Sequence, residues 1–145
     1  MEFEKDLFSP VQMEDKKDFV HLLDKAAAFH GHLCSGQIVG VRIALLGLRE
    51  LGILDPLGVD QKKIIVFAEV ARCFADAIMT VTGCRVGKRS FKIFDHGKAA
   101  ATFFNMTSGR SIRVGLLTNL HNRPIILLPP FARASFFARL VQIAQ

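Results

Sequence analysis

Apolar positions repeat with a helical period in the first third of the chain. From Lys16 they recur on one face of a helix, at Phe19, Leu22, Leu23, Ala26 and Ala27. His30 continues this face and Gly31 interrupts it. A second helical pattern runs from about residue 36 to 51, and its apolar side contains Val41, Ala44, Leu45, Leu48 and Leu51. Two consecutive helices are therefore predicted.

The middle of the chain changes to patterns typical of strands. After the loop GILDPLGVD, the run KKIIVFAEV is β-branched and apolar, and ARCFADAIMTVTG then predicts a helix that ends at Gly83. SFKIFD, KAAATFFNM and RSIRVGLL predict further strands, with a hairpin turn at residues 107–109. Helices first and neighbouring strands later favour a single α+β domain, with N-terminal helices packed on a mixed or antiparallel sheet.

Three segments are expected along the chain. Residues 1–15 form an N-terminal extension, residues 16–117 the core domain and residues 118–145 a C-terminal segment. The stretch PPFARASFFARLVQIAQ predicts a helix from residue 131. The wide apolar face of this helix must be buried against other parts of the protein or a partner. We expect this segment to belong to the same domain or to form a dimer or partner contact.

A stripe of small residues lies on the second predicted helix. Gly36, Gly40 and Ala44 are spaced by four, so they share one face. Glycine inside a helix costs about 1 kcal/mol relative to alanine. The stripe therefore predicts a close contact with another helix or another protomer.

Composition limits the classes of protein to which this chain can belong. With 145 residues and 50% hydrophobic content, the chain can build one core without disulfides. Its three cysteines form no CxxC pair, and its N-terminus lacks the apolar stretch of a signal peptide. No apolar run reaches the roughly 18 residues of a membrane-spanning helix. We therefore expect a soluble, cytoplasmic protein without a membrane span.

The net charge of +6 arises in the C-terminal part of the chain. The first 95 residues contain all 13 acidic residues and 13 of the 19 lysines and arginines, so they are balanced. The six basic residues after Asp95 are scattered singly. Scattered charge without aromatic RNA-binding signatures argues against nucleic acid and leaves an anionic small molecule as a candidate ligand.

The stretch FHGHLCSG concentrates candidate metal ligands. His30, His32 and Cys34 are donors that suit Zn²⁺ and similar ions. Cys34 precedes a predicted helix, where free N–H groups favour a thiolate, so it is also a candidate nucleophile. The two histidines flank Gly31 and would point to opposite sides of an extended turn. The alternative for each residue is an ordinary turn or core position.

A second group of candidates surrounds the central predicted helix. Cys73 lies in its first turn and Asp76 one turn later, where binding groups often gather. Cys84 follows Gly83 and is a third donor, a resolving thiol or a small buried residue. Lys98, within DHGKAA, suits an anion contact, although spacing alone favours an ordinary polar loop.

These stretches together resemble a known family. FHGHLCSGQIVGVRIA is similar to the H-G-H-x-C-P-G-x-x-x-G-x-R signature of the E-subunit family of formylmethanofuran dehydrogenase. EVARCFADAIMTVTGCRVGK and FDHGKAAATF resemble two further motifs of that family in the same order. The resemblance runs from about Phe19 to Val114. It implies an α+β core that is typically dimeric. It also implies a functional role for the residues that match the family motifs, namely His30, His32, Cys34, Arg42, Glu69, Arg72, Cys73, Asp76, Cys84, Asp95 and Lys98.

Two departures from the family pattern are visible. Ser35 replaces the usual proline after Cys34. Many relatives carry a C-terminal module of four zinc-binding cysteines, and no cysteine follows Val114 here. The resemblance also implies a link to one-carbon metabolism and to molybdenum or tungsten redox enzymes.

The leading hypothesis is a homodimeric metal-binding protein. We expect His32, Cys34 and Cys73 as ligands, with His30, Asp76 and Cys84 as supporting or alternative donors. Mixed donors favour zinc, with nickel and iron as alternatives. In an enzyme, Cys34 and Lys98 would be catalytic, while Arg72 and Asp76 would bind a cofactor or anion. The alternatives are an accessory subunit docking on a larger redox complex and a metal-free thiol protein.

Overall fold

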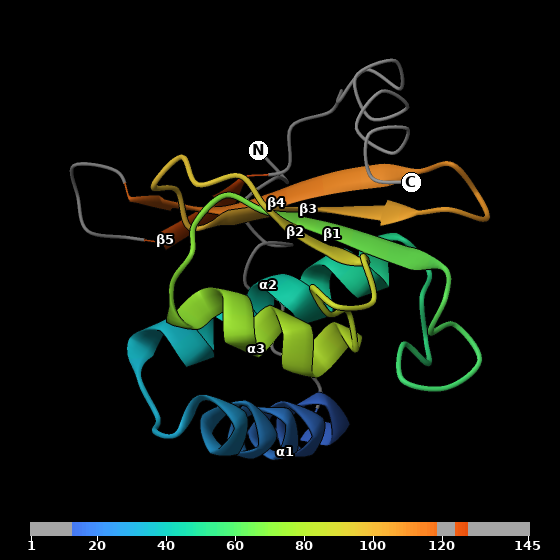
Figure 1. Ribbon diagram of the computed structural model, residues 1–145. Coiled ribbons are helices and arrows are strands. Elements are labelled where there is room, and N and C mark those ends of the chain that lie inside the picture. Colours follow the sequence, from blue (N-terminus) through green and yellow to red (C-terminus); the bar gives the residue numbers. More distant parts are fainter. Residues whose placement is uncertain (1–12, 119–123, 128–145) are drawn as a thin grey trace, which may run out of the picture.

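The computed structural model describes residues 13–118 and 124–127, which form three helices and one five-stranded sheet (Figure 1). The helices are α1 (Met13–His30), α2 (Ser35–Glu50) and α3 (Cys73–Thr82). The strands are β1 (Ile64–Ala68), β2 (Phe91–Ile93), β3 (Ala100–Asn105), β4 (Ser111–Thr118) and β5 (Pro124–Leu127).

The sheet is mixed, in the order β2-β1-β3-β4-β5. Strand β1 runs parallel to β2, while the other neighbouring strands pair antiparallel. Helix α3 connects β1 to β2, and a crossover of this kind lets two consecutive strands run parallel. The predicted α+β class, with N-terminal helices on a mixed sheet, is confirmed.

All three helices lie on the same side of the sheet (Figure 1). Helices α2 and α3 pack together next to the sheet, and α1 packs on the outer side of this pair. Strand β1 is buried along its whole length: Val66 joins the core under the helices, while Ile65 and Phe67 form a smaller cluster with Phe104. Burial on both faces explains why β1 is an unbroken apolar run.

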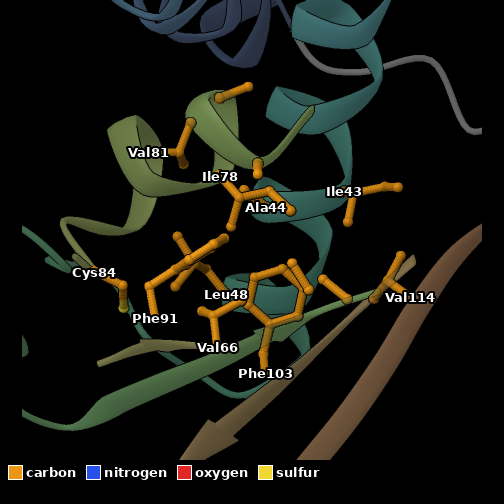
Figure 2. Close-up of a cluster of buried hydrophobic side chains, with 14 of the residues drawn as sticks. Ile43, Ala44, Leu48, Val66, Ile78, Val81, Cys84, Phe91, Phe103 and Val114 are labelled. Atoms are coloured by element: carbon orange, nitrogen blue, oxygen red, sulfur yellow. The ribbon is translucent and has the colours of Figure 1, made fainter. Parts of the chain in front are cut away.

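The main core joins α2 and α3 to the sheet. Figure 2 shows Ile43 and Leu48 of α2, Ile78 of α3 and Phe103 of β3 pointing into a common cluster. Burying one such side chain stabilises a fold by roughly 1.5–3 kcal/mol. This core sets the position of the starts of α2 and α3, which carry the candidate site.

The small-residue stripe is a contact between α2 and α3 within the chain. A Cβ added at Gly40 would lie 2.6 Å from the Cβ of Ala77 and 2.7 Å from the carbonyl oxygen of Phe74. A Cβ at Gly36 would lie 2.8 Å from the Cβ of Cys73. Of the two predicted alternatives, the helix contact is therefore the one observed. Its consequence is that the first turns of α2 and α3 lie side by side.

Several element ends follow the sequence pattern. Gly83 ends α3 in the left-handed conformation, with φ of 71°. Gly109, also at positive φ, donates its N–H to the carbonyl of Asn105 in the predicted hairpin turn. The described helices include none long and apolar enough to cross a membrane.

Strand β5 was not among the expected strands. It pairs with β4 and lies in the predicted C-terminal segment, so that segment adds a strand to the same sheet. The short apolar run PIIL was the available signal, and the proline at its start obscured it. The predicted N-terminal extension (residues 1–15) falls almost entirely outside the described residues, and the helix from residue 131 wholly outside them.

Candidate metal centre

The ends of three helices converge on one group of donor atoms. His30 is the last residue of α1, Cys34 is the N-cap of α2 and Cys73 is the first residue of α3. One ligand atom from each of these three residues lies within 4.8 Å of those of the other two. All three side chains are half-buried. The structure thus brings together two motifs that are 39 residues apart in the sequence.

The imidazole of His30 is oriented by Asp76. Its Nδ1 lies 2.8 Å from Oδ2 of Asp76, across the contact between α1 and α3. Its Nε2 is buried and has no hydrogen-bond partner in the part of the chain that the structure describes. A carboxylate on one ring nitrogen fixes the tautomer so that the other nitrogen presents a lone pair, as in many metal-binding histidines.

The two thiols lie at adjacent helix starts. Cys34 has an extended backbone (φ −143°, ψ 171°), and its carbonyl accepts the first N–H bonds of α2, from Gln37 and Ile38. Cys34 itself is the N-cap, and Ser35 is the first helical residue. A hydrogen bond with the Cys34 thiol, followed by burial, raises the pKa of the Cys73 thiol. Two adjacent thiols resist joint ionisation, whereas a divalent cation between them favours two thiolates.

Gln37 supports the site and was not predicted from the sequence. It is fully buried, and its Nε2 donates a hydrogen bond of 2.6 Å to the carbonyl of Cys73. This bond ties the first turn of α2 to the start of α3. The available signal was a polar residue beside the apolar stripe of a helix, three positions after Cys34.

His32 lies beside the group of three donors and not within it. Its side chain is exposed, and its ring centroid is 4.7 Å from that of His30, at an interplanar angle of 42°. The expected opposite orientation of the two histidines is not observed. The reason is Gly31, whose φ of +102° turns the chain back instead of extending it. His30, expected only as a supporting donor, therefore occupies the central position.

The environment of Cys84 differs from that of the other two cysteines. Cys84 is 1% exposed and sits among the core side chains beyond the C-terminal end of α3 (Figure 2). Its thiol lies 3.7 Å from the carbonyl oxygen of Ile64, and burial raises its pKa. Among the predicted roles, the small buried residue matches this placement, and the structure does not bring Cys84 to the donor group.

The loops before α3 and after β2 are bound to each other. The carboxylate of Asp95 accepts hydrogen bonds from the N–H groups of Ala71 (3.3 Å) and Gly97 (2.9 Å). These bonds, together with the charge of Arg72, lower the pKa of Asp95. The side chains of Arg72, His96 and Lys98 are exposed on these loops. The roles predicted for Arg72 and Lys98 remain predictions, and Asp95 has the structural task of joining the loops.

Glu69 and Arg42 each contact another side chain, and these contacts explain both residues by a structural role. Both carboxylate oxygens of Glu69 accept hydrogen bonds from Arg113, at 2.5 and 2.8 Å, and Arg113 was missed by the sequence reasoning. This bidentate pair lowers the pKa of Glu69 and raises that of Arg113. The guanidinium of Arg42 lies 4.9 Å from the ring centroid of Phe19, joining α2 to α1.

Comparison with known proteins finds a solved structure of similar fold and a relative in sequence. A chain of a tungsten formylmethanofuran dehydrogenase FmdE-like protein from Syntrophus aciditrophicus superposes with a TM-score of 0.56 at 24% identity. That match covers 68% of this chain and 50% of the other. A probable S-adenosyl-L-methionine-binding protein from Archaeoglobus fulgidus is 32% identical over 94 residues, or 64% of this chain, which spans only 26% of that relative.

The strongest assignment comes from a family profile. The family described as "FmdE, Molybdenum formylmethanofuran dehydrogenase operon" matches residues 29–126, which begin directly before His30 and include Cys34, Cys73 and Asp76. This range is more than half of the chain and contains every element from α2 to β4. The chain belongs to the FmdE family.

Proposed function

We propose that the chain binds one divalent transition-metal ion through Nε2 of His30 and the thiolates of Cys34 and Cys73. The observation that carries this proposal is the buried Nε2 of His30, which lacks a hydrogen-bond partner among the described residues while Nδ1 is held by Asp76. An unpaired buried ring nitrogen costs roughly 1–3 kcal/mol. A bound cation beside two thiols removes that cost.

The donor set fits zinc best. Zinc bonds of about 2.0–2.1 Å to nitrogen and 2.3 Å to sulfur place the ligands of one tetrahedral site roughly 3–4 Å apart. The donor atoms here lie within 4.8 Å of one another, so small side-chain rotations complete the site. Nickel and iron are the alternatives, because imidazole and thiolate also suit them.

Three protein donors are typical of catalytic zinc sites, whereas structural sites use four. An ion held in this way would act as a Lewis acid toward a carbonyl or phosphoryl oxygen. Asp76 would keep the ring of His30 in place, and Gln37 would hold the start of α3 against α2. The exposed Arg72 and Lys98 would attract an anionic group of a substrate, and Lys98 is our candidate for a catalytic cation.

Elemental analysis of the purified chain tests the proposal. We expect about one metal ion per chain in the wild type and its loss in His30→Ala, Cys34→Ser and Cys73→Ser. Cys84→Ala is the matched control, because it removes a thiol outside the donor group and should keep the metal. Unchanged metal content in Cys34→Ser, with the fold intact by circular dichroism, would reject this ligand set.

Family membership supports a proposal about the metabolic role and the partners of the chain. We infer an association with formylmethanofuran dehydrogenase, and hence with one-carbon metabolism and molybdenum or tungsten redox chemistry, in the cytoplasm. The chain would act there as a homodimer or as an accessory subunit of a larger redox complex. Co-purification from the source cells with a molybdenum- or tungsten-containing enzyme is the expected result. Isolation of the chain without such an enzyme would count against this setting.

A further inference from the structure

We propose that Cys34 and Cys73 also form a reversible disulfide, which links the starts of α2 and α3 and gives the site an oxidised, metal-free state. This inference rests on the proposed function only where it concerns the metal. The disulfide itself depends on the positions of the two thiols, which the structure shows without any ion.

The two sulfur atoms are close enough to bond after a small movement. They lie within 4.8 Å of each other. A disulfide requires about 2.05 Å between sulfurs. Cys34 precedes α2 in an extended conformation and its side chain makes no capping hydrogen bond, so rotation about its Cα–Cβ bond breaks no helical contact.

Gly36 provides the room for this approach. A Cβ at this position would lie 2.8 Å from the Cβ of Cys73 and 3.7 Å from the sulfur of Cys34. Any other residue would therefore push the first turn of α3 away from Cys34. The glycine that brings the helix starts together is thus also the residue that keeps the two sulfurs within reach.

Exposure separates this pair from the third thiol. Cys34 and Cys73 are half-buried, whereas Cys84 is 1% exposed inside the core. A small oxidant in solution reaches the pair and is excluded from Cys84. The chain therefore contains two accessible thiols and one buried thiol.

The chemistry requires a peroxide as oxidant. The thiolate of one cysteine attacks a peroxide oxygen, the O–O bond breaks, and a sulfenic acid and one water are formed from hydrogen peroxide. The second thiolate then attacks this sulfenic sulfur, forming the S–S bond and releasing the oxygen as a second water. Overall, two thiols lose two electrons and two protons, and one hydrogen peroxide becomes two waters.

The consequence is mutual exclusion of the disulfide and the metal. Only thiolates are metal ligands, so the disulfide removes two of the three proposed donors and leaves His30 alone. Conversely, sulfurs bound to a cation are less available to the peroxide. The site would release its ion under oxidising conditions and recover it after reduction.

The experiment uses the full chain, freed of metal by a chelator, with one equivalent of hydrogen peroxide. We expect an intact mass about 2 Da lower than that of the reduced chain, as two thiols become one disulfide. Peptide mapping should identify the Cys34–Cys73 link, and a dithiol reductant should reverse it. Cys84→Ala should behave as the wild type, while Cys34→Ser and Cys73→Ser should gain oxygen without forming a link within the chain.

Two results would overturn the inference. One is sulfenic or sulfinic acid at Cys34 and Cys73 without a link between them. The other is a link that involves Cys84 or a second chain. Either would mean that the helix starts hold the sulfurs too rigidly or too far apart to bond.

Metal content measured on the same protein separates this inference from the proposed function. A wild type that binds no zinc but forms the disulfide supports the disulfide and rejects the metal site. A wild type that binds zinc but forms no disulfide does the reverse. If the wild type both binds zinc and forms the disulfide, one equivalent of zinc should slow disulfide formation by at least about tenfold, because the thiolates are then ligands.

Discussion

One cysteine lies at the start of α3 and another just beyond its end, and the two differ in exposure and in the donor atoms around them. At its start, half-buried Cys73 meets Cys34 and His30, and Asp76 holds the histidine ring. Beyond its end, Cys84 is 1% exposed, its thiol next to a backbone carbonyl. A thiol becomes a candidate ligand through the donors around it and its access to solvent, whereas an apolar environment makes it a core residue. Sequence spacing alone does not distinguish the two.

Replacement of the cysteines at the two ends should give the largest contrast. Cys73→Ser is expected to lower zinc affinity by at least about a thousandfold, because a neutral hydroxyl replaces a thiolate ligand. Cys84→Ala should keep the affinity and lose about 1 kcal/mol of stability through a small cavity. Competition with a chromophoric chelator measures the first effect and urea unfolding the second. Equal affinities for both variants would remove the distinction between the two ends.

Asp76→Asn should weaken metal binding without removing a ligand. The amide no longer supplies a negative charge to Nδ1 of His30, so the ring is less basic and less well oriented. Loss of such an outer partner lowers metal affinity by about 10–100-fold. Asp24→Asn, at an exposed carboxylate of α1, is the matched control. If both variants bind zinc equally well, the bond between Asp76 and His30 has no part in the site.

Gly40→Ala should loosen the packing that positions one end of α3. The new Cβ would lie 2.6 Å from Ala77 and 2.7 Å from a backbone oxygen, so α2 and α3 must separate. We expect a loss of about 1–3 kcal/mol in the free energy of unfolding, typical of overpacking. Gly87→Ala is the control, since a Cβ there has no atom of the described residues within 4 Å. A Gly40→Ala variant as stable as this control would refute close packing of the two helices.

Glu69→Gln should have the smallest effect, and one that depends on pH. The ion pair with Arg113 lowers the pKa of Glu69 in the folded chain, so its stabilisation is fully present above the unfolded value, about 4.3, and is lost progressively as pH falls through the lower folded value. A half-buried bidentate pair contributes on the order of 1 kcal/mol. Urea unfolding should show a larger difference from wild type at pH 7 than at pH 3.5. The same difference at both values would contradict this role.

Much of the fold was readable from the sequence because it is encoded by local periodicity. The apolar pattern located α2 and α3 to within a few residues, and Gly83 marked the end of α3. Strand β5 was missed because its run is short and begins with proline. The class of the sheet followed from the order of elements, whereas its single parallel pair depends on the crossover through α3.

The site was readable only in part. Residue type and helix starts pointed to Cys34 and Cys73, because both features are local. The choice between His30 and His32 depended on the backbone at Gly31, whose positive φ no periodicity reveals. Gln37 and Arg113 entered through contacts with residues 36 and 44 positions away, respectively.

Local sequence therefore specified the donors, and packing selected among them. Helical period, caps and residue chemistry act over a few positions, so they are present in the chain before it folds. The meeting of Cys34 with Cys73, and the burial of Cys84, depend on how closely α2 approaches α3 and the sheet. That approach is possible because Gly36 and Gly40 carry no side chain, and it results from the shared core beneath the two helices.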